Sequence, residues 1–209
     1  MIKDLKDALK LAMMMKSAKS SVVIGIVGAV FGVLTLFLNV QASFCGGLFT
    51  MYAWMMPIAF VAQQEVCTMC AASPKRRRIS INSVDLLTVC GAVTSYLCIA
   101  LAANLSPRNV DKCALVNYVV VSAILIFYGI AYRAYWMGVI LLGVVVGVGC
   151  GCGSELAALG AGLTDWQEAL VGLGLVAIGW FVGSLLRHLL YKRPVSSVMN
   201  ASLERHLAK

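Results

Sequence analysis

The sequence predicts an all-α polytopic membrane protein with six transmembrane helices and an amphipathic helix before the first of them. Of the 209 residues, 61% are hydrophobic and only 12% are charged, which leaves too little polar surface to cover a water-soluble globule. Six stretches lack Asp, Glu, Lys, Arg and His, and each is close to the length of about 20 residues that a helix needs to cross a bilayer. These predicted spans are 22–40, 44–62, 86–105, 113–132, 134–152 and 169–186, and together they predict a single transmembrane domain over 1–209.

The predicted spans must be helical, because lipid offers unpaired backbone groups no water to bond. Residues 1–20, before the first span, also have helical spacing. Leu5 and Leu9 fall on one face, and Lys6 and Lys10 fall on the other. This pattern predicts a helix that lies on the membrane surface. Whether it only orients the first span or also docks a partner is open at this point. A cleaved signal peptide is disfavoured, because the charged segment is long for a leader.

The positively charged residues predict which ends of the spans face the cytoplasm. All but two of the 17 Lys and Arg residues fall before span one, between spans two and three, between spans four and five, or after span six. Only Arg108 and Lys112 fall elsewhere. Because positive loops stay on the cytoplasmic side, we expect a multi-pass cell-membrane protein with both termini in the cytoplasm and a tail at 187–209. This orientation explains the net charge of +8, so we expect membrane lipid rather than nucleic acid as a partner.

The segment 63–84 is the longest predicted cytoplasmic connection. Its first part lacks helix breakers and is expected to continue span two, ending near Ser73 because Pro74 disfavours helical geometry in the residue before it. Ser73 can then cap a short new helix that presents a basic run. The basic run consists of Lys75, Arg76, Arg77 and Arg78. These charges can act in partner docking, or they can hold a solvated loop at anionic headgroups, and the residues alone leave both open.

Residues 153–168 are predicted to lie outside the cell between spans five and six. The segment is too apolar for a free loop and too short to cross the bilayer. A re-entrant segment of half-inserted helices would explain this mixture, with Trp166 at the interface that aromatic residues prefer. An ordinary extracellular loop is the alternative.

Two further patterns have competing interpretations. Glycines recur every fourth residue in three predicted spans, and small residues at this spacing allow close helix packing, either within one chain or between two copies. These glycines are Gly28 and Gly32, then Gly143, Gly147 and Gly151, then Gly179 and Gly183. Cys67 and Cys70 have the spacing of zinc ligands, but no second ligand pair accompanies them in a predicted cytoplasmic loop. We therefore expect no metal site.

The segment 72–79 resembles the signature of type-2 ABC-transporter permeases, especially the small six-span exporter subunits whose ATPase is a separate polypeptide. In that family an extension of span two ends in small-Leu/Ser-Pro-x-x-Arg followed by Ile or Val, and this chain reads Ala-Ser-Pro-Lys-Arg-Arg-Arg-Ile. An amphipathic elbow helix, three helical hairpins and an outer re-entrant segment are further family features with counterparts here. The chain departs from the pattern at Ala71 and Ala72, where a leucine is common.

The resemblance implies an exporter membrane subunit that works with a second permease copy, identical or different, and with ABC ATPase subunits. ATP and Mg would be bound by the ATPase, so this chain would have no cofactor and no catalytic residue. The residues that would couple to the ATPase are Ser73, Pro74, Lys75, Arg76, Arg77, Arg78 and Ile79. Because the predicted spans carry no charged binding group, we expect an amphipathic peptide or a lipophilic compound as cargo.

Motifs of a self-sufficient enzyme or carrier are missing from the sequence. It has no Gly-x-x-x-x-Gly-Lys-Ser/Thr, no His-Glu-x-x-His and no Gly-x-Ser-x-Gly, and no Asp, Glu, Lys, Arg or His falls in a predicted span. These absences disfavour a self-sufficient pump, enzyme or proton-coupled carrier. They favour a membrane protein that takes its energy from a partner. One rival hypothesis is a non-transporting immunity or sensory scaffold, which would purify without an ATPase. Another is a small channel or secondary carrier, which would conduct on its own.

Overall fold

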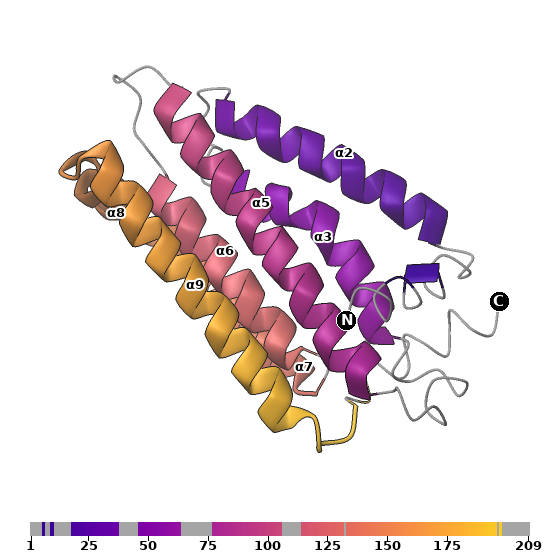
Figure 1. The fold of residues 1–209 in the computed structure, drawn as a ribbon. Helices are drawn as coiled ribbons and strands as arrows, with labels where there is room; N and C mark the ends of the chain where they lie inside the picture. Colours follow the sequence, from indigo (N-terminus) through magenta and orange to yellow (C-terminus); the bar gives the residue numbers. More distant parts are fainter. Residues whose placement is uncertain are drawn as a thin grey trace.

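The computed structural model describes residues 6, 9–10, 18–37, 46–63, 77–105, 114–131, 133–195 and 197, and its regular structure there is entirely helical (Figure 1). The elements are α2 (Ala18–Phe37), α3 (Gly46–Gln63), the π-helical η2 (Arg78–Ser83), α5 (Val84–Leu105), α6 (Ala114–Ile130), α7 (Tyr135–Gly151), α8 (Gly153–Ala161) and α9 (Asp165–Leu190). The all-α prediction is confirmed for this part of the chain.

Two helical segments are long and apolar enough to cross a membrane, namely Ile81–Leu105 and Asp165–Leu190. Three further apolar helical stretches are shorter within the described residues, and they are Val22–Leu36, Ala114–Ile130 and Tyr135–Val145. Each predicted span overlaps one of the six long helices. The crossing of a bilayer by all six stays a prediction.

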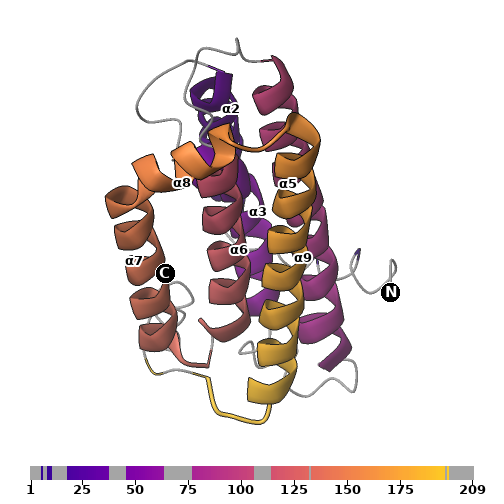
Figure 2. The same cartoon turned by 90° about the vertical axis from the view of Figure 1, so that its left-hand side faces the viewer.

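The long helices form a bundle in which successive members alternate in direction (Figures 1 and 2). Helix α6 is the central member, since it packs against α9, α7, α3 and α5, and most of its residues are buried. Helix α2 packs mainly on α3, and α7 stands at the edge against α6. This alternation brings the start of α5, the α6–α7 turn and the end of α9 to one end of the bundle.

The sides of the bundle are apolar, and several polar side chains lie inside it. Large apolar residues are exposed along α2, α5, α7 and α9, among them Val27, Leu101, Ile140 and Phe181. By contrast, Asn117 in α6 is buried. Soluble monomers rarely expose apolar surface on this scale, whereas lipid accommodates it.

We call the sets of glycines at every fourth residue the glycine stripes, and these sets differ in what they contact. A Cβ on Gly32 of α2 would come within 2.6 Å of the backbone nitrogen of Thr50 in α3, and Gly183 of α9 lies directly against the backbone of α6. These two stripes therefore pack helices together within the chain. Around Gly143 and Gly147 of α7, in contrast, nothing would lie within 4 Å of an added Cβ. The α7 stripe makes no such close approach among the described residues.

Two helix starts are fixed by side-chain hydrogen bonds. The first amides of a helix have no partner within it. In α3, the Gly47 N–H donates to Oδ1 of Asn117 across the bundle, at 2.7 Å. In α9, Thr164 and Gln167 form a reciprocal capping box. This box starts α9 at Asp165, four residues before the predicted span at 169–186.

The segment 153–168 is helical over most of its length. Helix α8 covers Gly153–Ala161 and lies across one end of the bundle, where it contacts α6 (Figure 2). A short turn then leads to α9, and Trp166 at its start is exposed. The segment 153–168 is thus a short helix and a turn, followed by the first turn of α9.

Candidate functional site at the basic end of the bundle

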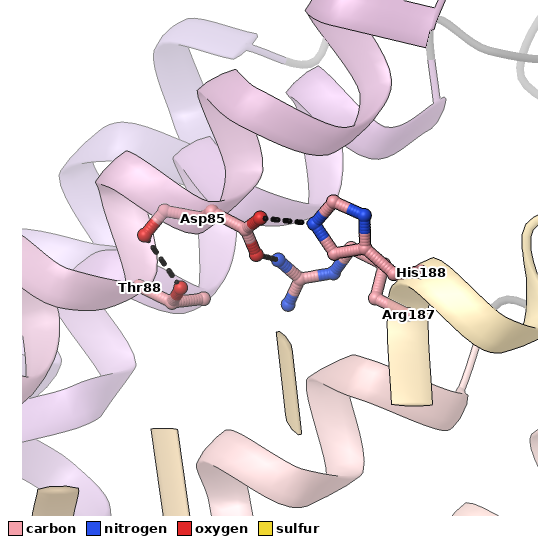
Figure 3. Close-up of polar contacts among 4 residues, drawn as sticks. All are labelled: Asp85, Thr88, Arg187 and His188. Carbon is pink, nitrogen blue, oxygen red and sulfur yellow. Dashed lines mark hydrogen bonds and ion pairs between the residues drawn. The ribbon is translucent and has the colours of Figure 1, made fainter. Parts of the chain in front are cut away.

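An ion-pair cluster joins the start of α5 to the end of α9 (Figure 3). The carboxylate of Asp85, in the first turn of α5, pairs with the guanidinium of Arg187, 102 residues later in the last turn of α9. Its second oxygen lies 3.2 Å from Nε2 of His188. The side chains of Asp85 and Arg187 are only 17% and 11% exposed, so water screens this pair less than a surface pair. The cluster fastens α5 to α9 at this end.

The predicted coupling segment leads directly into α5. Ser73, Pro74, Lys75 and Arg76 lie outside the described residues, and only the backbone of Arg78 and Ile79 is described. Arg77 is exposed and helical, and η2 follows it without a break into α5.

The sequence predicted a separate short helix in this segment, but the described part is continuous with α5. The reason is local: no helix breaker follows Arg77, and the apolar side chain of Ile81 is buried within the bundle. Arg77 and Asp85 therefore belong to one helical rod, about 12 Å apart along its axis at 1.5 Å per residue. The α5–α9 ion pair is thus connected to Arg77 through one continuous helix. The π-helical turn between them is a geometry that occurs often at functional sites.

A second cluster at this end gathers two arginines around one aromatic ring. The guanidinium carbon of Arg77 lies 5.9 Å from the ring centroid of Tyr191, and that of Arg133 lies 5.5 Å from it. These are cation–π distances. Arg133 also donates to the backbone carbonyl of Arg193 at 2.5 Å. Three segments distant in sequence thus meet at Tyr191, namely the start of η2, the α6–α7 turn and the end of α9. We call Arg77, Arg133 and Tyr191 the Tyr191 cluster.

Sequence reasoning identified only some of the candidate functional residues at this end of the bundle. It selected Arg77 as a coupling residue and Arg133 as an orienting charge, but it assigned no role to Asp85, His188 or Tyr191. A signal for Asp85 was present, since it is an acidic residue directly before an uncharged span. No comparable signal in the sequence indicated that two guanidinium groups would contact the Tyr191 ring.

The opposite end of the bundle contains a small cavity that sequence reasoning also missed, with room for about one water molecule. It is lined by residues of α5, α6 and α9, including Asn104, Tyr118, Asp165 and Glu168. The Glu168 residue is only 3% exposed. The sequence predicts it within the re-entrant segment 153–168, but the structure places it in the first turn of α9. A buried carboxylate near a membrane-capable helix end is a candidate polar site.

Within the described part of the chain, no three His, Cys, Asp or Glu side chains gather in a way that could hold a metal ion. Cys67 and Cys70 lie outside that part. The expectation that this chain carries no metal or cofactor stays a prediction.

Comparisons with known proteins identify no family. No family model matches the chain, and neither a curated protein nor a solved structure gives a significant match. The resemblance to type-2 permeases therefore depends on the segment 72–79 and on the predicted arrangement of spans.

Proposed function

We propose that this chain is the membrane subunit of an exporter that is driven by a separate ATPase. The observation that carries the proposal is the unbroken helix from Arg77 through η2 into α5, together with the fastening of α5 to α9 by Asp85 and Arg187. A partner that moved Arg77 would displace two long helices at once.

The proposal places all six long helices across the membrane. It is supported by the apolar sides of the bundle and by an uneven distribution of charge. From residue 77 onward, the Lys and Arg side chains that the structure describes lie at one end, and Glu155, Asp165 and Glu168 lie at the other. The basic end would face the cytoplasm, because positive segments are retained there. A cytoplasmic ATPase would meet the coupling segment at this end.

In this mechanism, closure of the ATPase dimer presses on residues 73–79. Helices α5 and α9 tilt as a unit, and α9 slides along α6. The contact between α9 and α6 suits such a movement, because Gly179 and Gly183 bring α9 directly against Ser122 and the backbone of α6. Small sliding of packed helices is a common form of conformational change. The cargo, an amphipathic peptide or a lipophilic compound, would pass between this chain and a second permease copy.

The proposal is tested by affinity purification in mild detergent, followed by mass spectrometry of the co-eluting proteins. We expect an ATPase in an equal amount. Replacing residues 74–78 with a Gly/Ser linker should abolish its recovery, and Arg77→Ala should reduce it. Lys192→Ala is the matched control, because Lys192 is an exposed cation at the same end but outside the coupling segment.

If the chain elutes alone under conditions that preserve other membrane complexes, the proposed ATPase partner is contradicted. The immunity or sensory scaffold is then favoured. Full recovery of the ATPase with the linker variant would refute the assignment of the coupling segment. An equal loss with Arg77→Ala and Lys192→Ala would indicate general charge attraction, which also contradicts that assignment.

A further inference from the structure

Two exposed tryptophans lie at opposite ends of the bundle. Trp136, in the first turn of α7, is 65% exposed, and Trp166, in the first turn of α9, is 77% exposed. Helix α7 begins at the basic end, and α9 begins at the other end (Figure 2). The indole combines an apolar ring with a polar N–H, so tryptophan is enriched in the headgroup layers on both sides of a membrane. One exposed indole at each end is the arrangement expected where two headgroup layers meet the bundle.

The length of α9 between its polar ends matches the thickness of a bilayer. From Trp166 to Arg187 the helix rises about 32 Å at 1.5 Å per residue. The hydrocarbon core of a bilayer is about 30 Å thick. No Asp, Glu, Lys, Arg or His lies between Ala169 and Leu186, and Glu168, just before this stretch, is buried in the bundle. Helix α9 can therefore cross the core with Trp166 at one boundary and Arg187 at the other.

The surface between the two tryptophans is apolar. Ile140, Val144 and Val148 of α7 are each more than half exposed. The same is true of Leu170 and Ile178 of α9. From residue 77 onward, the charged side chains that the structure describes lie at the two ends of the bundle. A bilayer accounts for both features, because its core takes apolar side chains and its two surfaces take indoles and charges.

The end that carries Trp166 also carries α8. This helix runs across the end of the bundle instead of along the long helices (Figure 2). Ser154 and Glu155 in its first turn are exposed, and so is Leu159 one turn later. Exposed polar and apolar residues on one short helix suit a headgroup layer, where water and acyl chains are both within reach. A re-entrant helix would instead descend into the hydrocarbon.

We propose that Trp136 and Trp166 lie in the two headgroup layers of a bilayer, and that α8 lies in the layer at Trp166. The partner of this surface is the lipid bilayer itself. The inference rests on the membrane placement in the proposed function, but it does not depend on the ATPase. It is therefore measured on the chain alone, separately from ATPase recovery.

The test is tryptophan fluorescence of the full-length chain in phosphatidylcholine vesicles. The lipid carries bromine, a quencher, either near the headgroup (the shallow label) or near the end of the acyl chain (the deep label). The difference between wild type and Trp136→Phe or Trp166→Phe reports the ring removed. We expect each of these rings to lose more fluorescence with the shallow label than with the deep label. Trp180→Phe is the matched control, because Trp180 packs against the core from the same helix as Trp166, and its removal should leave the shallow quenching unchanged.

A ring placed midway along α9 tests whether the helix crosses the bilayer or lies along its surface. Ile178 is 61% exposed and lies about 18 Å from Trp166 along the helix axis. We expect Ile178→Trp, made in a chain that carries Trp136→Phe and Trp166→Phe, to be quenched more by the deep label. Because Ile178 points away from the core, the larger side chain should not disturb the packing.

Three results would overturn the proposal. Stronger quenching of Trp166 by the deep label would mean that the segment 153–168 is re-entrant. Stronger quenching of Ile178→Trp by the shallow label would mean that α9 lies along the membrane surface. Quenching of neither Trp136 nor Trp166 by either label would mean that water or protein, not lipid, covers these ends.

Discussion

Replacing Asp85 with Asn tests whether α5 and α9 are held together by their ion pair. Exposed ion pairs contribute about 0–1 kcal/mol, whereas removing one partner of a fully buried pair costs about 3–5 kcal/mol. The Asp85 and Arg187 side chains are 17% and 11% exposed, which places this pair between the two limits. We expect Asp85→Asn to lower the free energy of unfolding by about 2 kcal/mol, or about 30-fold in the equilibrium constant.

The assay is reversible unfolding by sodium dodecyl sulfate in mixed micelles, followed by tryptophan fluorescence. A double-mutant cycle with Asp85→Ala and Arg187→Ala isolates the pairwise energy, which should be about 1–2 kcal/mol. His188→Ala serves as the graded control. The His188 side chain is 45% exposed, so His188→Ala should lower the free energy of unfolding by less than about 1 kcal/mol. A coupling energy below about 0.3 kcal/mol would refute the idea that the pair fastens the two helices.

The same substitution separates docking from transmission in the proposed exporter. Asp85→Asn leaves the coupling segment itself unchanged, so the ATPase should still co-purify and hydrolyse ATP. Transport of the cargo per ATP hydrolysed should fall, because α9 no longer follows α5. If Asp85→Asn removes the pairwise energy between Asp85 and Arg187 but leaves transport unchanged, force does not pass from α5 to α9 through this pair.

Two further pairs of substitutions test the packing of the bundle with the same unfolding assay. Gly183→Ala places a Cβ against backbone that cannot rotate away and should cost about 1–3 kcal/mol, whereas Gly147→Ala faces open space and should be neutral or stabilising by up to about 1 kcal/mol. Asn117→Leu leaves a buried helix-start amide without its acceptor and should cost about 1–3 kcal/mol, whereas Asn104→Leu removes an exposed hydrogen bond and should cost little. Equal effects within either pair would contradict the packing described above.

The sequence by itself determined the helical fold and the positions of the long helices. The predicted span at 86–105 and the observed Val84–Leu105 differ by two residues at one end. This agreement has a local cause, since an uncharged apolar stretch must satisfy its backbone hydrogen bonds within itself. The predicted start of the last span falls after the observed start of α9, because the sequence places the polar residues at 165–168 in the re-entrant segment. The Thr164 and Gln167 pair carried the capping signal that fixes the true start.

Only the tertiary structure decided which side chains meet. Asp85 pairs with Arg187, which lies 102 positions later, and the Tyr191 ring contacts Arg77 and Arg133 from two other segments. Helices that are apolar on all sides carry no periodic signal for the face that turns inward, so their sequence does not specify their neighbours. Packing specifies them instead. Gly183 allows α9 to approach α6 closely, and the polar groups at the helix ends are then brought together by the resulting geometry.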